Sequence, residues 1–225
     1  MRARVVSRAN ASTPRPRTRG ARRGDDERRD AWSAGVRRAR DVDEARAGAL
    51  EDLCVIFCSP KTAANVGAFA RACAAFECVD LRTTSPVCDC GSRAALSAAK
   101  DARAVAARAG REGRFETLRE ALAGCSAAVA FHPWREEDDA GGRRAFDDLE
   151  AMMEAFPGGV GGGKLALVFG NEADGLTREE LEACDAVCSI PMGRLVESLS
   201  VTHAGVIALS RYYERRVRAG AAERR

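Results

Sequence analysis

Short apolar runs alternate with amphipathic segments along most of the chain. The apolar runs predict strands at residues 53–58, 79–83, 127–131, 165–169 and 187–190. Apolar residues at helical spacing predict helices at residues 66–76, 94–109, 117–123, 145–156, 177–184 and 199–218. Strands that alternate with helices favour βαβ units, which build an α/β domain with a parallel sheet and helices on both faces. Ligands bind such sheets beyond the carboxyl ends of the strands, which directs attention to the segments after Cys58, Phe169 and Ile190.

The first 24 residues lack this pattern. They contain eight arginines and no acidic residue before Asp25, a composition typical of an organelle transit peptide. A basic arm that contacts RNA, or a start codon assigned too far upstream, would give the same composition. We expect residues 1–45 to be a transit peptide and linker, residues 46–219 a single domain, and residues 220–225 a disordered tail. The expected location is a chloroplast or mitochondrion, with the cytoplasm as the alternative.

The balance of charge excludes a uniformly basic protein. The 225 residues carry a net charge of +3, and subtracting the eight N-terminal arginines leaves −5 for the rest. Residues 211–225 hold six arginines and two glutamates, so residues 25–210 carry −9. If the chain binds RNA, phosphate contacts must therefore come from local clusters, such as Arg71 with Lys61, and from the Arg-rich C-terminal helix. No uninterrupted apolar stretch approaches the length of a membrane span, so no membrane association is expected.

The cysteines argue against a metal site and a disulfide framework. The chain has nine cysteines, no Cys-x-x-Cys pair, and only His132 and His203 as histidines. A structural zinc site would need closely spaced Cys or His pairs at two places. An odd number of cysteines without a signal peptide does not fit a secreted, disulfide-bonded protein. We expect reduced, buried thiols that behave as small apolar side chains, and no metal.

The first candidate motif follows the strand at residues 53–58. Asn65 lies where an N-cap is expected, just before the apolar period begins, and Gly67 leaves the first helical turn bare. Arg71 follows Gly67 by one turn, and a helical side chain leans toward its own N-terminus. Arg71 is therefore expected to reach over the start of the helix, where it suits a phosphate or another anion, although taken alone it equally fits a solvated face.

The second candidate motif connects a buried strand to a well-marked helix. The sequence Gly170-Asn171-Glu172 follows the strand directly, and Gly175 closes the loop. Thr177 and Glu180 form a predicted capping box for the next helix. A glycine at a strand end lets a ligand meet the backbone, and an acid in a constrained loop there is a candidate polar contact. A plain strand-to-helix turn would show the same glycine spacing.

The third candidate motif surrounds the start of the last helix. Pro191 ends the preceding strand, Met192 and Leu199 offer apolar walls for a flat ring, and Ser198 or a neighbour begins the helix. The small Ala204-Gly205 pair allows close backbone packing. His203 lies in an apolar helix, which favours a core or interface histidine over a catalytic base.

Together the three motifs resemble the SpoU-type branch of the SPOUT superfamily, which comprises S-adenosylmethionine-dependent RNA 2′-O-ribose methyltransferases. The matching residues are Asn65-x-Gly67-x-x-x-Arg71, Phe169-Gly170-Asn171-Glu172-x-x-Gly175-Leu176, and Ile190-Pro191-Met192 followed by Glu197-Ser198-Leu199. Residues 115–122 are similar to the tRNA (cytidine/uridine-2′-O) branch in particular. The resemblance covers about residues 53–218. It implies a C-terminal deep trefoil knot, a homodimer with each site completed across the interface, and tRNA as substrate, with rRNA second.

The resemblance also implies roles for individual residues. The catalytic residues it implies are Arg71, which activates or orients the 2′-hydroxyl and its phosphate, and Asn65, Glu172 and Ser198. The residues implied to bind S-adenosylmethionine are Gly170, Asn171, Ile190, Pro191, Met192, Leu199 and Ser200. Dependence on a 2′-hydroxyl would select RNA over DNA.

Three features depart from the family pattern. Ser200 stands where Asn is usual, His203 where a small or apolar residue is common, and residues 131–135 replace a loop that contributes to the cofactor pocket. A serine keeps a hydrogen-bonding group but has a shorter reach than asparagine. These departures favour, as the alternative function, a catalytically weakened RNA-binding or assembly protein that keeps the fold. An unrelated nucleotide-binding α/β enzyme lacks support, because the chain has no phosphate-loop or Gly-x-Gly-x-x-Gly motif.

Overall fold

A computed structural model describes residues 48–133, 144–196 and 198–222. The strands are β1 (Leu53–Cys58), β2 (Leu81–Thr84), β3 (Arg114–Phe115), β4 (Cys125–Phe131), β5 (Arg144–Phe146), β6 (Lys164–Phe169) and β7 (Ala186–Cys188). The helices are α2 (Ala63–Ala75), α3 (Arg93–Ala99), the short 3₁₀ helix η1 (Lys100–Ala102), α4 (Arg103–Ala109), α5 (Leu118–Ala121), α6 (Leu149–Ala155), α7 (Arg178–Glu182) and α8 (Val201–Ala222).

All described strands join one parallel sheet in the order β3-β2-β1-β6-β4-β7-β5. Every residue of β1 is buried, as is nearly all of β6, which is typical of central strands covered on both faces. This arrangement confirms the predicted parallel α/β class. Because all these strands run in the same direction, their carboxyl ends lie at one edge of the sheet.

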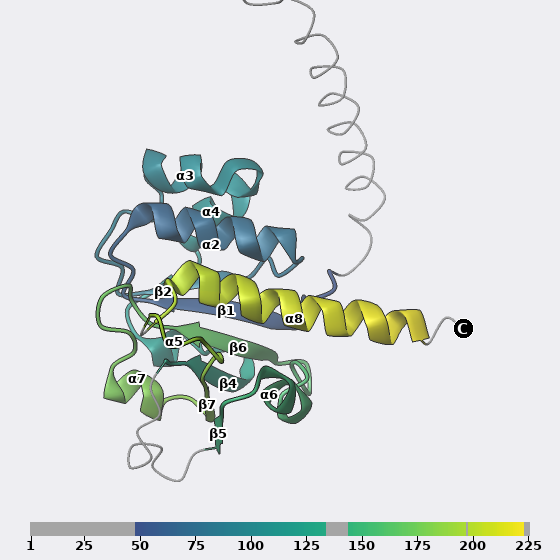
Figure 1. The fold of residues 1–225 in the computed structure, drawn as a ribbon. Helices are drawn as coiled ribbons and strands as arrows, with labels where there is room; N and C mark the ends of the chain where they lie inside the picture. The colour runs from purple at the N-terminus through teal and green to yellow at the C-terminus, as the bar shows by residue number, and fades with distance from the viewer. Residues whose placement is uncertain (1–47, 134–143, 197, 223–225) are drawn as a thin grey trace, which may run out of the picture. The chain divides into compact units, whose positions relative to one another are not determined.

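The two faces of the sheet carry separate apolar cores. Leu53, Val55 and Phe57 point to the face covered by α2, α3, α4, α6 and α8 (Figure 1). Cys54, Ile56 and Cys58 point to the opposite face, which packs against α5 and α7. The period of two along β1 thus divides its side chains between two helical layers, as predicted.

Two predicted helices differ from the structure, and two short strands were not predicted. The helix predicted at 94–109 is broken into α3, η1 and α4 at Lys100, whose φ is +54°. The helix predicted at 145–156 begins only at Leu149, because the Asp148 side chain accepts the N–H groups of Glu150 and Ala151 and caps α6 there. The strands β3 and β5 were not predicted, since two or three residues at a sheet edge are too short to show alternation.

The described residues contain no helix that is long and apolar enough to cross a membrane. Within the same residues, no group of three or more His, Cys, Asp and Glu side chains is arranged to hold a metal ion. All nine cysteines are free thiols, and all are buried except Cys88 and Cys125, which are half-buried. Their burial agrees with the prediction that the cysteines pack as apolar side chains. Residues 1–45, predicted to be a transit peptide and linker, lie outside the described residues. Of the tail predicted at 220–225, residues 220–222 belong to α8, and residues 223–225 lie outside the described part of the chain.

Candidate functional site

A pocket of about 310 Å³ lies at the carboxyl ends of β4, β6 and β7. Residues 131–133 line it after β4, and residues 169–175 line it after β6. The segment from the end of β7 into α8 contributes Cys188, Ile190, Met192, Ser198, Leu199, Val201 and Ala204. The pocket therefore forms where parallel strands end and three segments distant in sequence converge, as the strand-end rule predicts.

The loop after β6 is held by its own backbone. Asn171 and Gly175 pair through two hydrogen bonds of 3.1 and 3.2 Å, and the Asn171 side chain accepts the N–H groups of Ala173 and Asp174. Gly175 has φ +73°, a conformation that favours glycine. A Cβ on Gly170 would lie 2.1 Å from the Gly175 carbonyl carbon, so the close return of the loop requires glycine there. The predicted capping box of Thr177 and Glu180 is present and begins α7 immediately afterwards.

Glu172 joins this loop to the start of α2. Its carboxylate accepts the backbone N–H groups of Lys61 and Thr62 and the side-chain amide of Asn65, all at 2.9 Å. Burial raises the pKa of Glu172, but these hydrogen bonds outweigh it and hold the pKa below the usual 4.5. The ionised carboxylate thus fixes the position of α2 relative to the pocket loop.

Asn65 does not cap α2, contrary to the sequence prediction. The helix begins at Ala63 with Thr62 as its N-cap residue, and Asn65 lies inside the first turn. Its amide instead donates to Glu172. The local pattern could not show this, because the acceptor comes from more than a hundred residues away.

Gly67 also has a different role from the one expected. A Cβ at this position would lie 2.0 Å from the Ala95 carbonyl oxygen, so the bare helical turn receives the backbone of α3 and not a ligand. Gly205 acts similarly in α8, where a Cβ would meet the ring of Phe69 at 2.2 Å. This second contact confirms the close packing predicted for residues 204–205.

The segment before α8 supplies the apolar wall. Ile190, Met192 and Leu199 line the pocket together with Ser198, as the sequence suggested. Pro191 and Ser200 do not belong to the lining. The Ser200 hydroxyl lies 2.7 Å from His203 Nδ1 and accepts the His203 N–H at 3.4 Å, the position of a helix-capping group. Glu197 of the same motif lies outside the described residues.

Arg71 is exposed on α2 and is not part of the pocket lining. Six residues separate it from Asn65, which amounts to about 9 Å along the helix axis. One chain therefore brings together Asn65, Glu172, Gly170, Asn171 and the apolar wall, and leaves Arg71 apart from them. Its catalytic role stays a prediction.

Sequence reasoning left several lining residues unassigned. Val201 and Ala204 line the pocket from α8, and Asp174 lines it from the loop, where it pairs with the Lys61 ammonium at 2.6 Å. His132 contributes after β4, within the segment 131–135 that departs from the family pattern; Trp134 and Arg135 of that segment lie outside the described residues. The end of β4 carries the same strand-end signal as β6 and could have been included.

The amino-acid sequence and the fold both have counterparts among known proteins. An uncharacterized tRNA/rRNA methyltransferase of Mycolicibacterium paratuberculosis is 31% identical over 177 residues, which cover 76% of this chain and 50% of that protein. The tRNA (cytidine-2′-O-)-methyltransferase TrmJ of Methanocaldococcus jannaschii is 38% identical over 56 residues, covering 25% of this chain and 24% of that protein. The chain thus spans at most half the length of these curated relatives.

Solved structures share the fold. A probable methyltransferase from Bordetella pertussis Tohama I is similar with a TM-score of 0.62 and 27% identity, covering 74% of this chain and 96% of that one. The SpoU methyltransferase AviRb from Streptomyces viridochromogenes, in complex with the cofactor AdoMet, has a TM-score of 0.54 and 18% identity over 73% of this chain and 60% of that one. The model of the SpoU rRNA Methylase family matches residues 52–210. Motifs, fold and family match agree, and the chain belongs to the SpoU rRNA methylase family.

Proposed function

We propose that this protein is an S-adenosylmethionine-dependent RNA 2′-O-ribose methyltransferase. The observation that carries the proposal is the convergence of the second and third motifs on one pocket, with Glu172 tying the first motif to it. The family match supports the reaction class. The TrmJ relative named as a tRNA methyltransferase favours tRNA as the substrate, with rRNA as the second choice.

The pocket fits S-adenosylmethionine in chemistry and in shape. Ile190, Met192 and Leu199 offer apolar walls for the adenine ring, whereas Gly170 and Asn171 bring the backbone of the loop close to the ligand. Pockets for small molecules combine such walls with a few fixed polar groups. AviRb, a protein with the same fold, was solved in complex with AdoMet. When bound, the cofactor supplies an electrophilic methyl group.

Glu172 acts as a positioning residue. Its carboxylate is held ionised by three donors, so it is a weak base and cannot readily take the proton of a ribose hydroxyl. It instead orders α2 and the pocket loop so that the hydroxyl can be placed in line with the methyl group. Ser198 is exposed at the pocket rim and is available as a polar contact for the ribose.

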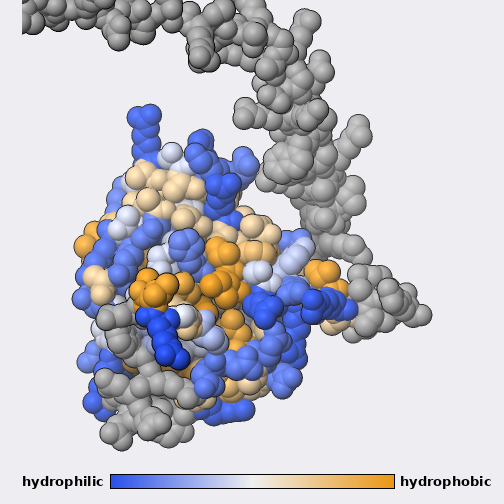
Figure 2. Space-filling model, viewed as in Figure 1, coloured by the Kyte–Doolittle hydropathy of each residue, from blue (hydrophilic) through white to orange (hydrophobic). Residues whose placement is uncertain are grey.

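The separation of Arg71 from the pocket supports a homodimeric site. A residue that polarises the 2′-hydroxyl has to contact it, and Arg71 is exposed and outside the lining of its own chain. We therefore place Arg71 at a site completed by a second copy. Exposed apolar side chains near the start of α8, namely Leu195, Val196 and Val206, offer a surface for this copy. Figure 2 shows hydrophobic residues, in orange, gathered on the face that carries the start of α8.

Further parts of the proposal rest on the family or on composition alone. Family membership supports a deep trefoil knot around the segment before α8, and the domain is proposed to extend over residues 46–219. The acid-free, Arg-rich residues 1–24 support import into a chloroplast or mitochondrion. Microscopy of the full chain fused at its C-terminus to a fluorescent protein tests the location, and cytoplasmic fluorescence would contradict it.

A catalytically weakened RNA-binding protein remains the second candidate. Ser200 favours it, because this side chain caps α8 and does not line the pocket. The decisive experiment measures transfer of a labelled methyl group from S-adenosylmethionine to total tRNA and rRNA, with Arg71→Ala as the comparison. Activity that is lost in Arg71→Ala supports the methyltransferase, and equal activity contradicts the role of Arg71. Cofactor binding by calorimetry without any transfer supports the second candidate.

A further inference from the structure

A basic segment covers one outer edge of an otherwise acidic domain. Residues 93–114, which span α3, η1, α4 and the start of β3, contain six Arg or Lys residues and two acidic residues, a net charge of +4. Residues 25–210 as a whole carry −9. This segment is therefore opposite in sign to its surroundings, and all six cations are exposed.

Within the described part of the chain, the cations of this segment form no ion pair with a carboxylate, whereas four arginines of α8 do. Among the described residues, the ion pairs leave out Arg93, Lys100, Arg103, Arg111 and Arg114, here called the α3–β3 surface. In α8, by contrast, Arg211 and Arg215 pair with Glu150, Arg218 with Glu214 and Arg216 with Asp52. A carboxylate beside an arginine partly neutralises its charge and occupies some of its N–H donors, which weakens its attraction for a phosphate. The α3–β3 surface is free of this competition.

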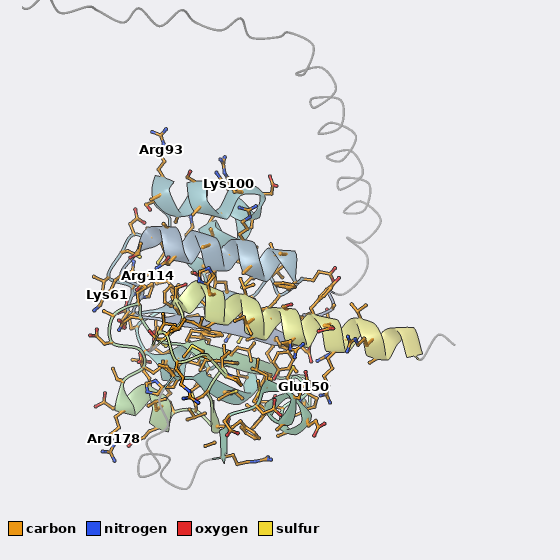
Figure 3. The ribbon with its side chains drawn as sticks, in the orientation of Figure 1. Lys61, Arg93, Lys100, Arg114, Glu150 and Arg178 are labelled. Atoms are coloured by element: carbon orange, nitrogen blue, oxygen red, sulfur yellow. The ribbon has the colours of Figure 1, made fainter. Side chains whose placement is uncertain are left out.

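The β3 end of the α3–β3 surface lies at the same edge of the sheet as the pocket, with β2 and β1 between β3 and β6. Lys61 follows β1 and donates its N–H to Glu172 of the pocket loop. The neighbouring Pro60 carbonyl accepts the N–H groups of Val87 and Cys88, which begin the loop leading to α3. Figure 3 shows Arg93 and Lys100 projecting outward from α3 and η1, with Arg114 at the same end of the sheet as Lys61. The register agrees, because Arg114 pairs with Thr83 near the carboxyl end of β2.

The chemistry of the α3–β3 surface favours a nucleic-acid backbone over a membrane. Helices that bind membranes carry exposed Trp, Phe or Leu beside their cations. Here the larger apolar residues Leu96 and Val105 pack against the core and are not available for insertion. Residues 93–114 contain no aromatic side chain on which a base could stack. Cations without aromatic residues contact phosphates, which contributes affinity and orientation but no choice of sequence.

We propose that the α3–β3 surface binds the phosphate backbone of RNA flanking the nucleotide at the pocket. The inference rests on the proposed function, and it adds a surface to the expected sources of phosphate contacts, which were local clusters such as Arg71 with Lys61 and the Arg-rich C-terminal helix. The surface holds the substrate through charge alone. It therefore affects RNA affinity and KM, and it does not affect binding of the cofactor.

The test compares two triple variants of the full chain that lose the same charge. The surface variant is Arg93→Gln, Lys100→Gln, Arg114→Gln, and the control is Arg211→Gln, Arg215→Gln, Arg218→Gln in α8. Affinity for total tRNA is measured by fluorescence anisotropy over a series of salt concentrations. The surface variant is expected to bind about tenfold more weakly at low salt, and its slope of log affinity against log salt should fall by about 2 to 3, roughly 0.7–0.9 for each lost phosphate contact. The control should retain the wild-type slope.

The outcomes distinguish a failure of the surface assignment from a failure of the proposed methyltransferase function. Unchanged affinity for S-adenosylmethionine by calorimetry, together with an unchanged melting temperature, shows that the surface variant is folded. Equal slopes in both triple variants would overturn the inference, as would full tRNA binding combined with lost binding to anionic phospholipid vesicles. Binding is read without methyl transfer, so a wild type that binds tRNA through this surface and transfers no methyl group contradicts the proposed function and leaves the surface assignment standing.

Discussion

Glu172 links two motifs that lie more than a hundred residues apart in the sequence. Its carboxylate satisfies two backbone N–H groups and one amide at the start of α2. Hydrogen bonds to an ionised acceptor are stronger than those between neutral groups, so the three donors favour the charged form of Glu172. The same contacts connect the protonation of one side chain to the stability of the fold.

Replacing Glu172 should give a loss of stability that depends on pH. A carboxyl whose folded pKa is lowered contributes stability above its unfolded pKa, and this contribution is lost as the pH falls through the folded value. Glu172→Gln is therefore expected to lower the free energy of unfolding at pH 7, with a difference that shrinks below about pH 4.5. Urea unfolding over this range measures it. Glu179→Gln, an exposed glutamate of α7, is the control, and an equal loss in both variants would contradict the prediction.

Cys125 is expected to be the most reactive thiol at neutral pH. The thiol of Cys54, 3.5 Å away, and the guanidinium of Arg82, 3.7 Å away, lower the pKa of Cys125. Cys88 is also half-buried, but burial raises its pKa to about 12. Brief treatment with iodoacetamide followed by mass spectrometry should label Cys125 well before Cys88, since the thiolate is the reactive form. Labelling in the reverse order would refute the assignment.

The loop between β6 and α7 shows how neighbouring elements fix a site. The capping box of Thr177 begins α7, and the buried strand β6 ends at Phe169, so the loop between them has little freedom. Its shape depends on contacts within the loop and on Glu172, which binds a different element. The pocket loop is therefore built largely from local signals, which explains why sequence reasoning located it.

Gly170→Ala should disrupt this loop. The added Cβ would meet backbone atoms of Gly175 and Leu176 at 2.1 and 2.3 Å, and backbone atoms cannot move aside as a flexible side chain can. We expect a destabilisation of about 1–3 kcal/mol and weaker binding of S-adenosylmethionine. Gly193→Ala is the matched control, because a Cβ there has nothing within 4 Å. Thermal unfolding and calorimetry measure both effects, and equal behaviour of the two variants would exclude this account.

Several apolar side chains remain exposed in the folded domain where α8 begins. Leu195 is 99% exposed, Val196 60% and Val206 39%. These residues flank Met192 and Leu199 of the pocket lining. An apolar surface beside a site suggests that a partner covers it. In the proposed dimer, this second copy completes the site in which we place Arg71.

Charge placed on this surface should separate the proposed dimer. Leu195→Glu with Val206→Glu is expected to shift the protein to monomers and to lower methyl transfer at least tenfold, because the site would lose its second chain. Analytical ultracentrifugation measures the association. The control is Val87→Glu with Val160→Glu, two side chains that are 73% and 63% exposed and belong neither to α8 nor to the segment before it. A wild type that is monomeric, or a dimer unaffected by Leu195→Glu and Val206→Glu, would contradict the prediction.

The sequence predicts those elements whose determinants lie within a few neighbouring residues, and it misses those that depend on residues far away in the chain. Apolar runs placed β1 and β6, and the Thr177 and Glu180 pair placed α7, because burial and capping act within a few residues. The edge strands β3 and β5 and the break at Lys100 escaped prediction, since pairing partners and packing against α2 decide them.

The amino-acid pattern was enough to predict the α/β class, the order of the main elements and the three motifs that led to the family. Periodicity, glycine placement and capping residues are local and survive in a linear reading of the chain. The tertiary structure alone decided what those residues contact. In the folded chain, the Asn65 amide donates to Glu172 and Gly67 packs against the backbone of α3. Arg71 lies outside the lining of the pocket in its own chain. These outcomes depend on which distant backbone atoms the fold brings within a few ångströms, and no local pattern encodes that distance.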